Sequence, residues 1–450
     1  MQIQQNNISY REPLEFARNR NTAASRVVEN TTPRAWRQLL PYIYIYNTLI
    51  LLPIAILLSG RYYTATRMED DNDAVDYWPY IVWCTFMSVP STTSMSFVSL
   101  WALVGWENVR PIALHNIIAI GLCMVWEFVL DVFFGIYGVT LEAPLQFAIL
   151  TIHIVNCRWV ISHRRKENNE RITSLEYVDD IDKNSVPWST IILTLPLTFA
   201  IAGTILFRWF FFNVFLNLET NELRTAFVSI GLPTATVFLN IFARLLTYRI
   251  VVNEDNGTSW TQMAALQLLL ATVGRTMASA LNSAGSSLVA TTVLGLIEIV
   301  SRITIKHRDS FMIYLHTCEW PEPEYWATPR KQRVLADTII VEMIAELAAI
   351  SFANMLVLIV NVWHFEVDPG EAFSAFIFNW SMQMMVEAVS DAISVMVEER
   401  WAGLRLVVAW HAGWKRMCIY IAYLIGSAGV WFAHHLMTSL LIPSLDQRNT

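Results

Sequence analysis

The residues best suited to chemistry in this sequence are ionisable side chains that interrupt long apolar runs. Seven are carboxylates: Glu127, Asp131, Glu298, Glu342, Glu346, Glu387 and Asp391. Five are arginines: Arg158, Arg208, Arg244, Arg275 and Arg302. A charge at the centre of a membrane-length apolar helix costs about 3 kcal/mol on insertion scales, so such residues usually face a partner or a hydrated cavity.

The spacing of these residues is regular. Three segments place two acids four residues apart, and a fourth places an acid four residues before a base: Glu127–Asp131, Glu342–Glu346, Glu387–Asp391 and Glu298–Arg302. On a helix each pair shares one face. Two carboxylates so close in a low dielectric cannot both stay ionised without a cation or an arginine between them, so one of each pair is otherwise protonated.

The seven carboxylates outnumber the five arginines, and this excess of acids favours a hydrated route for a cation or a proton-coupled solute. We expect an inner carboxylate site and an outer one, formed respectively by Glu298, Glu342, Glu346, Glu387 and Asp391, and by Glu127 and Asp131. Their counter-charges would be Arg208, Arg244, Arg275 and Arg302. Carboxylates suit hard cations with oxygen ligands, yet no spacing here specifies a metal, and we expect no cofactor. The alternative is that the charges only join helices.

The elements that position these residues are predicted to be membrane-spanning helices. The hydrophobic fraction is 54%, the charged fraction 15% and the mean hydropathy +0.40, values that exclude an ordinary soluble globular protein. Runs of about 20 apolar residues are long enough to cross a bilayer. They predict an all-α polytopic bundle of about eleven spans, at 40–59, 79–103, 111–138, 143–162, 187–217, 223–248, 261–281, 284–304, 335–363, 372–397 and 417–442. The polar break at Asn282–Ser287 leaves open whether 261–304 forms two full spans or a re-entrant pair.

Charge distribution predicts the orientation of the bundle. With the N-terminus inside, the inner segments hold about 22 Lys and Arg residues and the outer ones about 4, which follows the positive-inside rule. An odd number of spans then places the C-terminus outside. The Asn256 sequon falls on the inside and is expected to stay unglycosylated.

The remaining segments are predicted to be short. We expect residues 1–39 to form a disordered cytoplasmic arm, 40–442 one transmembrane domain, and 443–450 a short outer tail. The longest inner loops are 163–186 and 305–334, neither large enough for a catalytic domain. The tryptophan-rich segment 398–416 is either an interfacial helix or a connecting loop anchored by its tryptophans.

Several classes of function are excluded. The chain contains no Gly-Lys dipeptide and therefore no Walker A motif, and it has no HExxH or GxSxG motif. A formal charge of −7 argues against a nucleic-acid partner. The Glu398–Glu399 pair leaves an intramembrane hydrolase as a minor alternative. We expect a multi-pass transporter or channel-like permease, with the lipid bilayer and a small cation or solute as partners; the alternative is a structural or scaffolding membrane protein.

Overall fold

The computed structural model describes residues 35–51, 93–129, 148, 150–160, 162, 194, 198, 207–234, 237, 239–241, 244, 260–281, 283–321, 326, 329–363, 367–400, 403–411 and 413–426. Most of the predicted N-terminal arm, the loop 163–186, the sequon at Asn256, the tail 443–450 and parts of several predicted spans lie outside these residues.

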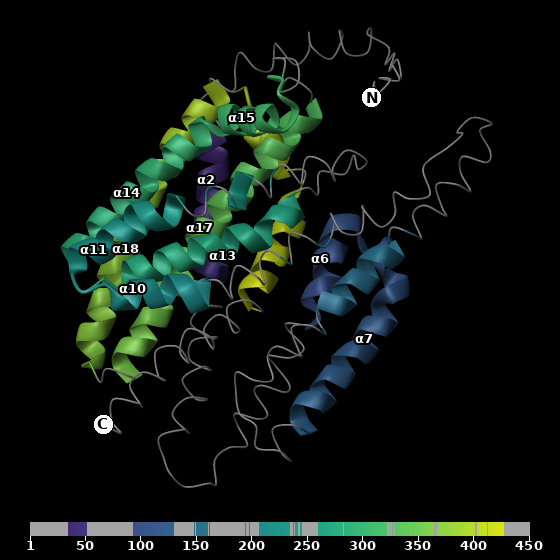
Figure 1. Ribbon diagram of the computed structural model, residues 1–450, viewed down its shortest axis with the longest axis horizontal. Coiled ribbons are helices and arrows are strands. Elements are labelled where there is room, and N and C mark those ends of the chain that lie inside the picture. Colours follow the sequence, from purple (N-terminus) through teal and green to yellow (C-terminus); the bar gives the residue numbers. More distant parts are fainter. Residues whose placement is uncertain are drawn as a thin grey trace.

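The described part of the chain is helical, without strands (Figure 1). Its α-helices are α2 Ala35–Tyr46, α6 Met95–Val104, α7 Trp106–Val129, α10 Asn213–Asn217, α11 Asn221–Ala226, α13 Trp260–Ser279, α14 Ala284–Ile303, α15 Ile305–Thr317, α17 Pro329–Trp363 and α18 Pro369–Arg400. Three short π-helical segments are η1 Asn47–Leu51, η4 Phe207–Phe212 and η5 Phe227–Gly231. Residues 150–160, 406–411 and 413–426 are also helical.

Two helical hairpins, α13–α14 and α17–α18, form the central bundle. The break predicted at Asn282–Ser287 ends one helix and starts the next, since the Ser283 hydroxyl accepts a hydrogen bond from the Ser286 backbone N–H (3.1 Å) and caps α14. Pro369 begins α18, and Asp368 accepts from the backbone N–H groups of Gly370 and Glu371. Because the connections are short, the helices of each hairpin run antiparallel.

Contacts between the hairpins give their relative direction. Arg275 bonds to Glu346, and further along both helices Ser279 bonds to Asn354. The residue numbers rise together, so α13 and α17 run in the same direction. Because each hairpin is antiparallel, α14 and α18 also run in the same direction as each other. Helix α17 lies at the centre of the bundle (Figure 1). The segment η1 packs against α17, and α2 packs against α18.

A second group of helices consists of α6, α7 and residues 150–160. Leu100, Val109 and Cys157 are among the buried residues of its small core. Asn156 exchanges hydrogen bonds with Asn116 and donates to Ser96. Such amide and hydroxyl contacts are common between helices in membranes.

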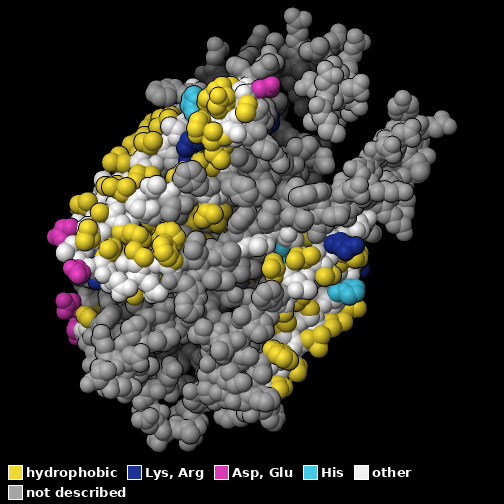
Figure 2. Space-filling model, viewed as in Figure 1, with side chains coloured by type: hydrophobic (Ala, Val, Ile, Leu, Met, Phe, Trp, Pro, Cys, Tyr) yellow, Lys and Arg dark blue, Asp and Glu magenta, His cyan; other side chains and the backbone are white. Residues whose placement is uncertain are grey.

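Three of the described helices are long and apolar enough to cross a membrane: Val109–Trp126 in α7, Ala284–Ile303 in α14 and Lys331–Ile359 in α17. Figure 2 shows hydrophobic side chains on the outward faces of α7 and α14. The predicted spans 261–281 and 372–397 form α13 and α18, two helices that carry polar residues into the bundle.

Two segments differ in detail from their sequence-based description. The region 305–334, predicted as a loop, contains α15 and the first turns of α17. The segment 398–416 is not one continuous helix, because α18 ends at Arg400 and Gly403 adopts a positive φ of 63° before the chain becomes helical again at Leu406. Trp410 in this segment is buried, with 4% of its surface exposed, and packs into the core.

Candidate functional site

The structure brings together acids and bases from four helices at the middle of the central bundle. Three of the pairs spaced four residues apart converge there: one on α14, one on α17 and one on α18. Arg275 of α13 joins them. The carboxylate cluster, as we call this group, consists of Glu298, Glu342, Glu346, Glu387 and Asp391, with the guanidinium groups of Arg275 and Arg302.

Arg275 contacts three acids on three other helices. Its Nε donates to Glu346 Oε2 at 3.0 Å, and its Nη2 donates to Glu387. The same Nη2 lies 3.9 Å from Glu298 Oε2. This single side chain from α13 therefore joins α14, α17 and α18.

Arg302 makes a second set of contacts with acids. Its Nη1 donates to Asp391 Oδ1 at 2.7 Å, and its Nη2 donates to Glu298 one turn earlier on α14. Its Nε lies 3.9 Å from Glu342 Oε2. Glu298 thus links the two arginines into one network.

The cluster contains more acids than bases, since two guanidinium groups face five carboxylates. The side chains of Glu387 and Asp391 are fully buried, and those of Glu298 and Glu346 are 10% and 20% exposed. Burial and mutual repulsion both disfavour five simultaneous negative charges. The excess charge must be neutralised by protons or by a bound cation.

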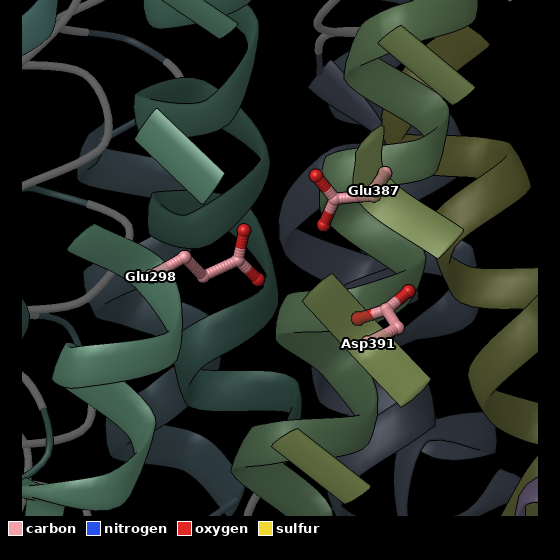
Figure 3. A group of neighbouring side chains, drawn as sticks. All are labelled: Glu298, Glu387 and Asp391. Atoms are coloured by element: carbon pink, nitrogen blue, oxygen red, sulfur yellow. The ribbon is translucent and has the colours of Figure 1, made fainter. Parts of the chain in front are cut away.

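Three of these acids have the geometry of a cation site. Glu298, Glu387 and Asp391, which we call the acid trio, each offer one carboxylate oxygen, and these atoms all lie within 4.8 Å of one another. In Figure 3, Glu298 points from its helix toward the two acids on the neighbouring helix. Oxygen donors of this kind suit hard cations such as Na⁺, K⁺ or Ca²⁺. The Oε1 atom of Glu387 is buried and has no hydrogen-bond partner among the described residues.

A tyrosine that the sequence analysis did not select completes this environment. The Tyr44 hydroxyl of α2 donates to Asp391 Oδ2 at 3.2 Å. It binds the oxygen that Arg302 leaves free, so Asp391 is held from two helices. No sequence signal distinguished Tyr44 from the other tyrosines of the first predicted span.

Neutral polar residues extend the polar interior beyond the cluster. Gln383 donates to the Ser279 hydroxyl (2.9 Å), which bonds to Asn354 (3.1 Å), and Asn354 donates to Gln383 (3.3 Å). All three side chains are buried. On α18 Gln383 lies one turn before Glu387, so amides and hydroxyls continue the line of carboxylates along the bundle axis.

Arg244, predicted as a counter-charge, lies elsewhere. Its Nη2 donates to Asp309 Oδ1 at 3.0 Å, and both side chains are buried. Asp309 belongs to α15, in the segment predicted as a loop, and was not a candidate from the sequence. The only sequence signal for this buried ion pair was the position of Arg244 in an apolar run.

The acids of the predicted outer site lie outside the side chains that the structure describes. Asp131 lies outside the described residues, and the side chains of Glu127 in α7 and Arg208 in η4 lie outside the described side chains. The structure therefore supplies contacts for the five acids of the inner site and for three of the four predicted counter-charges.

Glu398 is a further buried acid near this site that the sequence analysis assigned only to a hydrolase alternative. It follows Asp391 on α18 and is 2% exposed. Because it lies just past the predicted span 372–397, it was not counted among the intramembrane carboxylates. Neither of its carboxylate oxygens has a hydrogen-bond partner among the described residues.

Comparisons with known proteins found no matching family model, no matching curated protein and no matching solved structure. The function is therefore inferred from the chemistry of the site.

Proposed function

We propose that this chain is a multi-pass membrane permease for a cation, or for a solute coupled to protons or cations, with the acid trio as its ion-binding site. The observation that supports this proposal is the sharing of two arginines by five carboxylates, three of them buried and two partly exposed. A purely structural network would be expected to balance its charges. An excess of buried acid creates an affinity for protons or cations at the centre of the bundle.

The proposal includes the eleven-span topology with the N-terminus inside. The directions of the central helices agree with it, since α13 and α17 correspond to the seventh and ninth predicted spans, and α14 and α18 to the eighth and tenth. The first pair runs one way and the second pair runs the other way. This is the alternation that successive membrane crossings require.

The mechanism follows from competition for the acids of the trio. Without a cation, Arg275 and Arg302 together with bound protons neutralise Glu298, Glu387 and Asp391. A cation that enters the trio displaces a proton or repels a guanidinium group, and so breaks contacts that join α14, α17 and α18. Binding thereby biases the bundle between inward-open and outward-open arrangements.

The direct test removes charge from the trio and measures flux. The double variant Glu387→Gln/Asp391→Asn keeps the side-chain shape but removes two negative charges, so we expect it to abolish pH-dependent cation flux. The full chain is reconstituted in vesicles with an internal pH dye, and gradients of Na⁺, K⁺ and Ca²⁺ are imposed separately. Glu371→Gln is the matched control, because Glu371 is an exposed acid in the first turn of the same helix. Undiminished flux in the double variant contradicts the proposal.

One observation favours a scaffolding role as the second candidate. Each of the five acids lies within 4.0 Å of an arginine nitrogen, so the contacts alone would hold four helices together. Under this alternative, acid-to-amide variants lower thermal stability and no cation protects the wild type. Under the permease proposal, Na⁺, K⁺ or Ca²⁺ raises the melting temperature of the wild type and not that of the double variant.

A further inference from the structure

Polar residues continue along α18 from the acid trio toward the end of the helix. Glu387, Asp391, Ser394 and Glu398 are separated by four, three and four residues, which places them on one face. Each is buried, with an exposed fraction between 0% and 2%. The stripe therefore connects the centre of the bundle to the last turn of α18 inside the protein.

Glu398 differs from the acids of the cluster in its hydrogen bonding. Each cluster acid contacts an arginine, whereas both oxygens of Glu398 lack a hydrogen-bond partner in the part of the chain that the structure describes. The hydroxyl of Ser394, one turn earlier, also lacks one. A buried carboxylate without donors is unstable when ionised, so it holds a proton or needs a cation that can move toward it.

The register of α14 against α18 places Arg302 close to Glu398. The Ser390 hydroxyl donates to the Gly295 carbonyl oxygen at 2.9 Å, which fixes the two parallel helices relative to each other. Arg302 comes seven residues after Gly295, and Val397 comes seven residues after Ser390, so Arg302 and Val397 lie at the same level. Helical side chains lean toward the N-terminus of their helix, and Arg302 accordingly reaches back to Glu298 and Asp391.

Arg302 binds two acids of the trio and also acts electrostatically on Glu398. Its Nη atoms donate to Asp391 and Glu298, while its Nε atom is buried without a hydrogen bond to any residue that the structure describes. The charged groups that act on Glu398 are Arg302 of α14, Glu342 of α17, and Asp391 and Glu399 of α18. Among these, only Arg302 favours the ionised carboxylate.

We propose that Glu398 is a proton-binding site that competes with cation binding at the acid trio through Arg302. This inference rests on the proposed permease function and gives its coupling a sign. A cation in the trio repels Arg302 toward Glu398, which favours the ionised carboxylate and releases its proton. Conversely, a proton on Glu398 leaves Arg302 bound to Glu298 and Asp391 and weakens cation binding. One proton leaves as the cation enters, as in an exchanger.

Glu398 lies beyond the predicted span 372–397, and its pKa supports this coupling. Burial raises this pKa from its ordinary value near 4.5 to about 8, while Arg302 opposes the shift. Cation affinity should therefore increase as the pH rises toward about 8 and change little above it. Because one proton is exchanged, the increase is at most about tenfold per pH unit.

Calorimetry of the detergent-solubilised full chain tests the coupling. NaCl, KCl and CaCl₂ are titrated separately, in two buffers of different ionisation enthalpy, so that the protons released per bound cation can be counted. We expect Glu398→Gln to release about one proton fewer than the wild type and to retain cation binding. Glu398→Asp should keep the release. Glu371→Gln is the control, because Glu371 is an exposed acid in the first turn of the same helix, at the opposite end from Glu398.

The outcomes separate the two proposals. If none of the three cations binds the wild type, the coupling and a permease that carries these cations or is driven by them are both overturned. If the wild type binds a cation but Glu398→Gln releases the same number of protons, or binds no cation at all, the coupling alone is overturned. Should Glu398→Gln fail to fold, the wild type still decides the question, since an affinity that does not rise with pH below about 8 overturns the coupling.

Discussion

Two buried arginines of this protein have very different surroundings. Arg244 faces Asp309 in a pair that joins α15 to the segment containing Arg244. Arg302 instead divides its nitrogens among Asp391, Glu298 and Glu342. The acid of the Arg244–Asp309 pair has a guanidinium group within 3.0 Å, so it has little excess charge to attract another ion. The shared arginine leaves its acids incompletely neutralised, which is the property that an ion site requires.

At the level of single residues, removing Arg302 should expose this difference. Arg302→Gln leaves Asp391 and Glu298 buried without that guanidinium group, and we expect it to lower the free energy of unfolding by about 3–5 kcal/mol. Adding Asp391→Asn removes one of the stranded charges, so the double variant should be more stable than Arg302→Gln alone. Thermal unfolding in detergent measures both changes.

The control is Arg224→Gln, because Arg224 is a partly exposed residue of α11 that donates to the backbone carbonyl oxygens of Leu216 and Leu218. It should lower stability less than Arg302→Gln does. Strictly additive effects of Arg302→Gln and Asp391→Asn would show that the two side chains do not interact, and would contradict the contact.

At the level of helices, the cluster depends on a close approach of α14 to α18. A Cβ atom on Gly295 would lie 3.0 Å from Ser390 Oγ and 3.2 Å from Val386 Cγ1. The absence of a side chain lets the Ser390 hydroxyl reach the Gly295 carbonyl oxygen. This contact sets the register that brings Glu298 beside Glu387 and Asp391.

We therefore expect Gly295→Leu to separate α14 from α18 and to weaken both stability and cation binding. Overpacking at such a contact lowers the free energy of unfolding by about 1–3 kcal/mol. Gly285→Leu is the matched control. Gly285 lies on the same helix, and a Cβ atom there would have no atom of the described residues within 4 Å. Thermal unfolding and cation titration should be altered by the first variant and nearly unchanged by the second. Equal effects of the two variants would contradict the proposed role of the contact.

The positions of the central helices were predictable from the sequence, but the contacts between them were not. The apolar runs and the break at Asn282–Ser287 predicted the positions of α13, α14, α17 and α18 closely, because turns and hydrophobic length are local signals. The spacing of four residues likewise predicted which acids share a helix face. Which arginine meets which acid was not predictable, since Arg244 pairs with Asp309 of α15 and periodicity does not report contacts between distant segments.

The segment after α18 illustrates the same limit. Its tryptophans and basic residues are typical of an interfacial helix, yet Gly403 interrupts the helix and Trp410 packs into the core. Burial of a large aromatic side chain depends on neighbours that are remote in sequence. Glu398 was passed over for a related reason, because a predicted span end does not show how deeply a residue is covered by other helices.

At the level of the whole molecule, the apolar helices divide into a central and a peripheral class. The apolar stretch of α17 is 94% buried, whereas those of α7 and α14 are each 22% buried. Many of the exposed residues of α7 are large and apolar, including Leu114, Ile117, Leu122 and Val125. Exposed surfaces of this kind are unfavourable in water and are expected where lipid chains cover them.

Photolabelling from within the bilayer tests this arrangement for the full chain. Lipids with a photoactivatable group on the acyl chain should label the exposed faces of α7 and α14 after reconstitution. They should leave α17 largely unlabelled, because its neighbours shield it although it is equally apolar. Peptide mass spectrometry locates the adducts, and illumination of protein unfolded in detergent is the control, since there α17 should become labelled. Labelling of α17 equal to that of α7 in the folded protein would contradict the central position of α17, and no labelling of either helix would contradict a membrane-embedded bundle.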